Sequence, residues 1–114
     1  MIGERKEKQF DESQYEILIG CSDKGDLTQW NEWRENNQKV SILLEGANFI
    51  GANLAGADLW NADLKGAKFI SARVDKQTFI WGCDFDKQTV ITGIDLHLAK
   101  IEPRLIESLK LNLA

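Results

Sequence analysis

The chain has very little histidine, cysteine or proline, and it has no excess of basic residues. Its 114 residues include one histidine, two cysteines and one proline, and 14 Lys and Arg stand against 18 Asp and Glu, giving a net charge of -4. A chain without a basic excess is not typical of proteins that bind nucleic acid. Cys21 and Cys83 form no CxxC pair, so neither a disulfide scaffold nor a zinc site is indicated.

Long apolar segments are also missing. The N-terminal sequence MIGERKEKQF lacks the apolar centre of a signal peptide. The longest apolar stretch, around Tyr15–Cys21, is too short to cross a bilayer, which takes about 20 residues. We therefore expect a single-domain cytoplasmic protein with reduced thiols and no membrane span.

What the sequence does contain is a repeat with a period of five residues. Large apolar residues recur at Leu44, Phe49, Leu54, Leu59, Leu64, Phe69, Val74 and Phe79, and alanines precede six of them by two positions, at Ala47, Ala52, Ala57, Ala62, Ala67 and Ala72. This period matches neither a helix nor a flat strand. It fits a coil that turns a corner every five residues, with the large residue and the alanine inside. Four sides then close one turn, and residues 20 apart stack at ~4.8 Å.

These units resemble the pentapeptide-repeat family, whose pattern is A-(D/N)-L-x-x. The closest matches are Ala47-Asn48-Phe49, Ala52-Asn53-Leu54, Ala57-Asp58-Leu59 and Ala62-Asp63-Leu64. The resemblance implies an all-β fold, a right-handed quadrilateral β-helix, here with about three coils over residues 40–97. The motif is specific for this fold and says little about function.

The register of the repeat changes after residue 75. Residues 75–85 and 86–96 are identical at seven of eleven positions, and sides of five and six residues alternate. The inward series is predicted to continue with Phe79, Phe85, Val90 and Leu96, with Cys83 and Ile94 at the alanine positions. We expect the extra residue to form a bulge near Gly82 and Gly93. Gln77 and Gln88 then fall at inward positions, so either their amides are hydrogen-bonded or the register differs locally.

Both ends of a repeat array need caps. We assign residues 1–39 to a mobile arm (1–13) and an N-terminal capping region with a helix over 27–36, for which Asp26 or Thr28 is the predicted N-cap. Trp30 and Trp33 share one face of this helix, and a lid over the first coil is favoured over a ligand platform. For Tyr15–Cys21, alternation favours a strand, with a single helical turn as the alternative.

At the other end, residues 98–114 predict a C-terminal capping helix that Pro103 opens. Pairing of this helix with a second copy of the chain is the alternative to capping.

No catalytic, cofactor-binding or metal-binding site is predicted, and we expect a non-enzyme. One outward position of the repeat holds Asp58, Asp63, Asp84 and Asp95, which we interpret as structural because short polar side chains bond the backbone at turns. His97 has no second ligand or catalytic partner placed near it by spacing, and the chain contains no phosphate-binding motif.

The outer positions of the repeat hold large apolar residues that the core does not explain. Ile50, Ile70 and Ile91 are predicted to stack on one wall, and Trp60, Ile80 and Trp81 on another. Clustered exposed apolar groups mark interaction sites, so these six residues are candidates for partner docking. Simple packing along the stacked coils is the alternative.

The sequence therefore favours a non-enzymatic scaffold or protein–protein interaction module that binds a protein partner or a second copy of itself. The alternative function, which the resemblance suggests through the quinolone-resistance branch of the family, is a DNA-mimicking inhibitor of a type II topoisomerase. Three coils give a rod of ~14 Å, whereas one turn of DNA measures ~34 Å. The short rod and the modest charge argue against the mimic.

Overall fold

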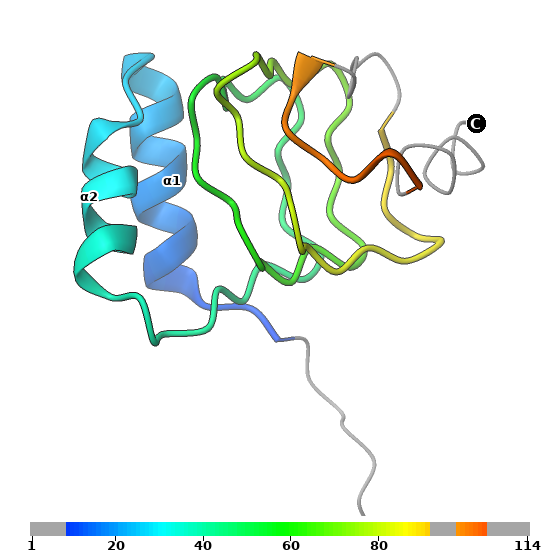
Figure 1. The fold of residues 1–114 in the computed structure, drawn as a ribbon, viewed down its shortest axis with the longest axis horizontal. Coiled ribbons are helices and arrows are strands. Elements are labelled where there is room, and N and C mark those ends of the chain that lie inside the picture. Colours follow the sequence, from blue (N-terminus) through cyan, green and yellow to red (C-terminus); the bar gives the residue numbers. More distant parts are fainter. Residues whose placement is uncertain (1–8, 92–97, 105–114) are drawn as a thin grey trace, which may run out of the picture.

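The computed structural model of the chain describes residues 9–91 and 98–104. Two helices, α1 (Glu12–Lys24) and α2 (Thr28–Asn36), come first. The five-residue repeats follow, and Figure 1 shows the helices side by side at one end of the stacked coils. Among the residues described, no helix combines the length and apolar character that crossing a membrane requires.

The prediction of an all-β fold, a right-handed quadrilateral β-helix, is wrong. The described residues contain two α-helices and no β-strand or sheet. Neighbouring turns of the chain meet through isolated bridges of single residues, such as Asn48 with Lys68 and Asn53 with Arg73. Between Gly46 and Ser71 every fifth residue has a positive φ, and this break in the extended backbone keeps the pairing to single residues.

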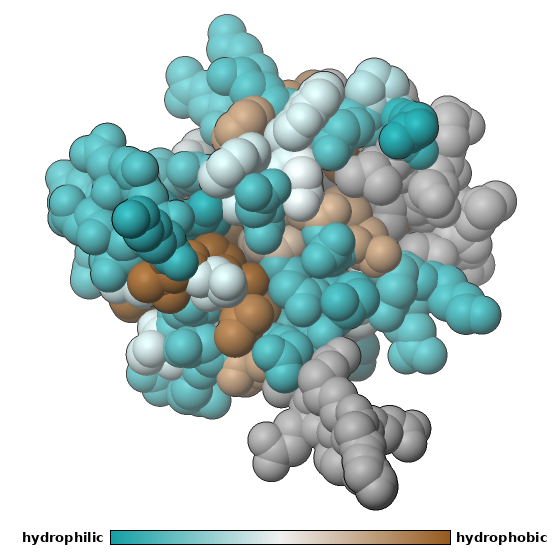
Figure 2. All heavy atoms as spheres, turned by 60° about the horizontal axis from the view of Figure 1, so that its bottom comes forward, coloured by the Kyte–Doolittle hydropathy of each residue, from teal (hydrophilic) through white to brown (hydrophobic). Residues whose placement is uncertain are grey.

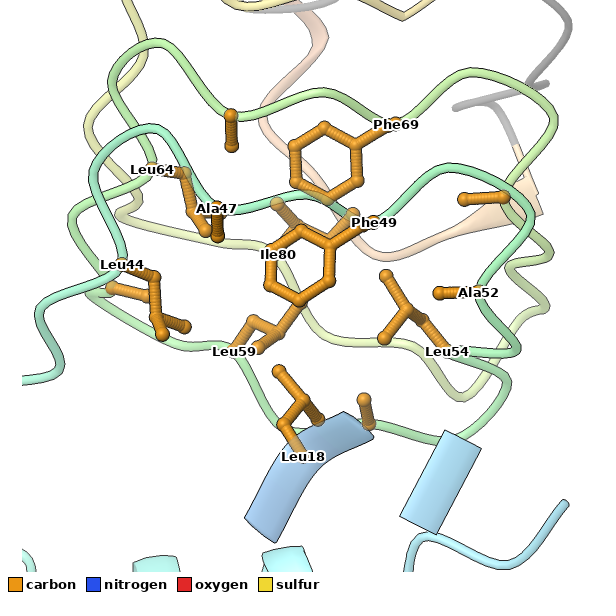
Figure 3. Packing of buried hydrophobic residues seen from close by; sticks show 14 of the residues in the cluster. Leu18, Leu44, Ala47, Phe49, Ala52, Leu54, Leu59, Leu64, Phe69 and Ile80 are labelled. Atoms are coloured by element: carbon orange, nitrogen blue, oxygen red, sulfur yellow. The ribbon is translucent and has the colours of Figure 1, made fainter. Parts of the chain in front are cut away.

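The expectation of stacking at 20 residues is confirmed up to Val74. Leu44 N donates to Asp63 O at 2.9 Å, and Phe49 N donates to Lys68 O at 2.8 Å. The large residues and alanines of this segment are buried, as predicted. Figure 3 shows their side chains pointing into the interior of the coils, where the rings of Phe49 and Phe69 stack with centroids 5.2 Å apart.

The predicted register after residue 75 is wrong at Phe79 and Val90, whereas Cys83 is buried at an alanine position as predicted and Phe85 packs against the core. Ile80 and Ile91 are only 2% and 5% exposed, and the fully buried Thr78 and Thr89 take the alanine positions. Gln77 and Gln88, which the sequence placed inside, are exposed. Phe79 and Val90 are instead half-buried bridge residues, paired with Asp58 and Lys68.

The extra residue lies at Asp75–Thr78 and again at Asp86–Thr89, and not near Gly82 as predicted. Gly56 N donates to Asp75 Oδ1 at 3.1 Å and lies 3.2 Å from Thr78 Oγ1. At the equivalent place in a five-residue side, Gly46 N donates to the backbone oxygen of Lys65. Side-chain oxygens thus replace a backbone carbonyl as the acceptor for this N–H group. This allows one side of the coil to contain six residues. Gly82 is an ordinary corner with φ 79°, and Gly93, Ile94, Leu96 and His97 lie outside the described residues.

The strand favoured for Tyr15–Cys21 is also wrong, because this segment belongs to α1. Asp11 caps the helix by accepting a hydrogen bond from Gln14 N at 3.0 Å, and Gly25 ends it in the left-handed conformation. Gln14, Leu18 and Cys21 are buried at the spacing of one helix face. The predicted mobile arm therefore ends earlier than residue 13, and residues 1–8 lie outside the described part.

Helix α2 agrees with the predicted 27–36 helix to within one residue. Its N-cap position is Leu27 rather than Asp26 or Thr28, although Asp26 Oδ1 accepts a hydrogen bond from Thr28 N at 3.0 Å. Trp30 is completely buried in the same core as the repeats, and its ring stacks on Trp33. This is the arrangement that a lid over the first coil requires.

The repeats continue further than the predicted boundary at residue 97. Lys100 bridges Phe79 and Ile101 is buried, so these two residues belong to the stacked coils, and helical backbone begins at Pro103, where the sequence predicted it. Most of the predicted C-terminal helix falls on residues 105–114, which lie outside the described residues.

Candidate partner-docking site

Of the six residues predicted for docking, three are clearly exposed. Ile50, Trp60 and Trp81 are exposed, and Ile70 is half-buried. The outward placement of Ile80 and Ile91 is wrong, because the six-residue sides shift both into the core. The predicted stripe of three isoleucines is therefore reduced to Ile50 and Ile70, whose corners are joined by a 2.8 Å bond from Gly51 N to Ile70 O.

Trp60 and Trp81 occupy equivalent corners on adjacent turns of the chain, and we call this pair the aromatic corner. Each tryptophan is 44% exposed. Asn61 N donates to Trp81 O at 3.0 Å, which aligns the two corners. In each turn the preceding residue, Leu59 or Ile80, is buried, so the tryptophan is left outside.

The backbone of Trp60 is fixed by several hydrogen bonds. Its N–H donates to Asp58 Oδ1 at 3.1 Å, and its carbonyl oxygen accepts from Arg34 Nη2 at 2.8 Å. The carbonyl oxygen of Asp58 accepts from Trp30 Nε1 at 2.8 Å and from Arg34 Nη1 at 3.3 Å. Burial lowers the pKa of Arg34. Helix α2 therefore holds this corner in place.

Two grooves flank Trp60. The larger, of about 690 Å³, lies between α2 and the Gly56–Trp60 segment and is lined also by Gln38, Lys39 and Gln77. The smaller, of about 350 Å³, lies on the side of Val40, Gly82 and Asp84. Most lining side chains are polar, and in the view of Figure 2 exposed apolar groups occupy a small area among hydrophilic ones.

Two of the aspartates at the shared outward position have a structural role, because their side chains accept hydrogen bonds from the backbone. Asp58 Oδ1 and Asp63 Oδ1 each accept from the backbone N–H two residues later, on Trp60 and Lys65. No such bond joins Asp84 to Asp86 in the described part, because Asp86 N donates to Thr89 Oγ1 instead. Asp95 lies outside the described residues.

A second charged group lies at Glu45, Asp63 and Lys65. Lys65 Nζ is 3.5 Å from both Glu45 Oε2 and Asp63 Oδ2. Burial raises the pKa of Asp63, the bond from Lys65 N opposes the rise, and the neighbouring Glu45 carboxylate adds to it. Glu45 Oε1 also accepts from Gln9 N at 3.0 Å. These contacts fasten the segment before α1 to the first coil.

The two thiols are buried and free. Cys83 Sγ donates to Leu59 O, and burial raises the pKa of this thiol to about 12. A thiol with this pKa is not an effective nucleophile at neutral pH. Within the described residues, no three His, Cys, Asp or Glu side chains come together as a metal site.

No pattern in the sequence predicts the grooves, because they depend on where α2 packs. The exposure of Trp60 and Trp81 was readable from their corner positions. That Arg34, Gln38 and Lys39 line the grooves could not be predicted, because no local sequence pattern indicates that residues 34–39 lie beside residue 60.

Comparison with known proteins agrees with the repeat pattern. The family model described as pentapeptide repeats (8 copies) matches residues 43–76, which supports the resemblance of this segment to the pentapeptide-repeat family. A segment of pentapeptide repeats is consistent with a repeat scaffold or interaction module and shows no specific role. No curated protein and no solved structure matches the chain.

Proposed function

We propose that the chain is a non-enzymatic protein–protein interaction module that holds its partner on the aromatic corner. The observation that carries this proposal is the exposure of two tryptophans at equivalent positions of adjacent turns, each at 44%. Tryptophan is among the residues that dominate binding energy in interfaces, and a pair of them exposed in register is a ready anchor.

Rigidity supports the same function. The corner backbone is held by the bonds of Trp60 to Asp58 and Arg34, and the coil beneath it is filled by buried Leu59 and Ile80. A surface that is already ordered loses little conformational entropy when a partner binds.

The aromatic corner is too small to act alone. A fully buried tryptophan covers roughly 150–250 Å², whereas a standard interface covers about 800 Å² per partner. The two grooves beside Trp60 enlarge the surface and supply a polar rim through Gln38, Lys39 and Asp84. An anchor surrounded by a polar rim is the usual anatomy of an interface. The alternative of a topoisomerase-inhibiting DNA mimic has no observation in its favour among the described residues.

Site-specific photo-crosslinking tests this function. An aromatic photoreactive amino acid, which keeps a ring at the corner, replaces Trp81 in one version of the full chain and Ile50 in a matched control, and each is irradiated in cells of the source organism. We expect position 81 to crosslink one protein that position 50 does not, or a second copy of the chain. The purified partner should then bind Trp60→Ala and Trp81→Ala at least about tenfold more weakly than wild type. Equal crosslinking at both positions, or unchanged affinity in both variants, would contradict the proposal.

A further inference from the structure

The larger groove beside Trp60 carries free side-chain groups that both donate and accept hydrogen bonds. Two amides, one ammonium group and one carboxylate are exposed there and take part in no hydrogen bond or ion pair within the described part of the chain: Gln38, Gln77, Lys39 and Glu35. An amide donates and accepts, an ammonium group only donates, and a carboxylate only accepts. A ligand that satisfies all of them needs groups that both donate and accept.

The charges of the groove balance one another. Two basic and two acidic side chains line it: Arg34, Lys39, Glu35 and Asp58. The guanidinium of Arg34 is already bound to the backbone oxygens of Asp58 and Trp60. An anion would meet two carboxylates and would compete with these carbonyls, while a cation would meet two basic groups. The groove therefore suits a neutral ligand.

The coil backbone along the groove has no free group for an added peptide strand. Every N–H and carbonyl group from Gly56 to Trp60 already has a partner, either in the neighbouring coil or in a side chain. A peptide that binds as an added strand pairs with free backbone groups at an edge. The groups left for a ligand are therefore the scattered side chains, which suit separate hydroxyl groups better than a continuous peptide backbone.

Trp60 supplies the apolar surface of the groove. Among the described residues that line it, only Trp60 has an apolar side chain, and this residue is 44% exposed. The volume of about 690 Å³ lies within the range of roughly 300–1,000 Å³ that small-molecule sites have. A ligand that fits is polar around its edge and apolar on one face. A pyranose ring has this form, because C–H groups cover its faces and its hydroxyl groups each donate once and accept twice.

We propose that the larger groove binds a neutral oligosaccharide, with one pyranose ring stacked on Trp60 and its hydroxyl groups bonded to Gln38 and Gln77. The carboxylate of Glu35 accepts from a further hydroxyl group, and the ammonium group of Lys39 donates to another. This site goes beyond the proposed protein-binding function and does not rest on it. It shares only Trp60 with the aromatic corner, because Trp81 does not line the groove.

NMR titration of the ¹⁵N-labelled full chain with maltotriose, cellotriose and N-acetylated chitotriose tests the inference. The control ligand is sorbitol, which carries hydroxyl groups without a ring. We expect at least one trisaccharide to bind with a dissociation constant of about 1 mM or below, and to shift the indole N–H signal of Trp60 more than that of Trp81. Sorbitol should bind at least about tenfold more weakly, because it has no ring face to stack on the indole. Binding by none of the three sugars, comparable affinity for sorbitol, or a larger shift at Trp81 would overturn the inference.

Variants locate the sugar in the groove. Trp60→Ala should weaken binding of the trisaccharide about tenfold, as expected for removal of one aromatic contact, and Trp60→Phe should retain most of it. Gln77→Ala should weaken binding severalfold, whereas Ile50→Ala, outside the groove, should not. Unchanged binding in Trp60→Ala would overturn the inference, and thermal melts of every variant show whether the fold is intact. If no sugar binds while the partner crosslinked at position 81 still depends on Trp60 and Trp81, only the sugar inference is lost.

Discussion

The side-chain amide of Asn31 in α2 takes the place that a preceding coil would occupy beside Asp58. Asp58 N donates to Asn31 Oδ1 at 2.9 Å, and Asn31 Nδ2 donates to Gly56 O at 2.9 Å. One turn later, the equivalent residue Phe79 donates its N–H to the backbone oxygen of Ala57. The helices thus satisfy backbone groups that the first coil would otherwise leave unpaired.

Removal of this amide should destabilise the fold. In Asn31→Ala the N–H of Asp58 and the carbonyl of Gly56 lose their partner, and we expect a loss of about 1–3 kcal/mol in the free energy of unfolding. Gln38→Ala is the matched control, since its amide has no partner in the described structure, and it should change stability by less than about 0.5 kcal/mol. Urea unfolding measures both, and similar losses in the two variants would contradict the capping role.

Core substitutions test the inward assignment of the repeats. Leu64→Ala should cost about 2–5 kcal/mol through the cavity it leaves, because Leu64 is completely buried. Ala62→Leu should cost about 1–3 kcal/mol by overpacking a tight position. Thermal unfolding of both, with Ile50→Ala as the exposed control, checks the assignment. If Ala62→Leu melts like wild type while Asp63→Leu unfolds the chain, the inside and outside are reversed.

The register after residue 75 can be tested at two neighbouring positions. Thr78 Oγ1 donates to Leu54 O at 2.9 Å, whereas Gln77 faces solvent. Thr78→Val keeps the shape and removes the hydroxyl, so we expect a loss of about 1–3 kcal/mol in the free energy of unfolding. Gln77→Ala should have almost no effect on the same measurement. A larger loss of unfolding free energy in Gln77→Ala than in Thr78→Val would instead support the register in which Gln77 points inward.

Protonation of Asp75 at low pH should destabilise the fold, because Asp75 holds together a six-residue side of the coil. Burial acts to raise the pKa of Asp75, but the hydrogen bonds from Gln77 N, Gly56 N and Thr78 outweigh it and lower the pKa. A lowered carboxyl pKa adds stability that is complete above the unfolded value of ~3.9 and is lost as the pH falls through the folded value. Asp75→Asn should therefore reduce the loss of unfolding free energy between about pH 5 and pH 2. An unchanged pH dependence would show that Asp75 does not contribute.

Cys83 should be unreactive until the chain unfolds. Its thiol is buried and burial raises its pKa to about 12, so very little thiolate forms at pH 8. We expect no labelling by a thiol-reactive dye in the native protein and complete labelling in urea. Mass spectrometry of the labelled peptide identifies the cysteine, and rapid native labelling of Cys83 would contradict its placement in the core.

The sequence predicted the repeats correctly where the period of five residues is uninterrupted and only one register fits. From Leu44 to Val74 the period of five is uninterrupted, and every inward residue predicted there is buried. After Asp75 two registers fit the pattern about equally, because Phe79 and Ile80 are both large and apolar. Bonds from Gly56 N to the side chains of Asp75 and Thr78 decide between them, and such tertiary bonds leave no mark on hydrophobic periodicity.

Helix α1 illustrates a second cause of error. The alternation of Tyr15, Ile17 and Ile19 favours a strand, whereas the helical spacing of Gln14, Leu18 and Cys21 includes a polar residue and so gives no clear apolar face. Gln14 is buried because its amide binds Ser41 O and Leu43 N, far away in the sequence. The exposure of Trp60 and Trp81 was predictable from position, but the grooves beside Trp60 required the packing of α2.

The central claim is that a partner binds over Trp60 and Trp81, and NMR of the tryptophan side chains tests it most directly. The four indole N–H signals of ¹⁵N-labelled chain are assigned with single Trp→Phe variants, and the crosslinked partner is then added. Trp30 is an internal control, because its indole N–H is buried and bound to Asp58 O. We expect the signals of Trp60 and Trp81 to shift or broaden while that of Trp30 stays in place. Signals of Trp60 and Trp81 that remain unchanged at saturation would contradict it.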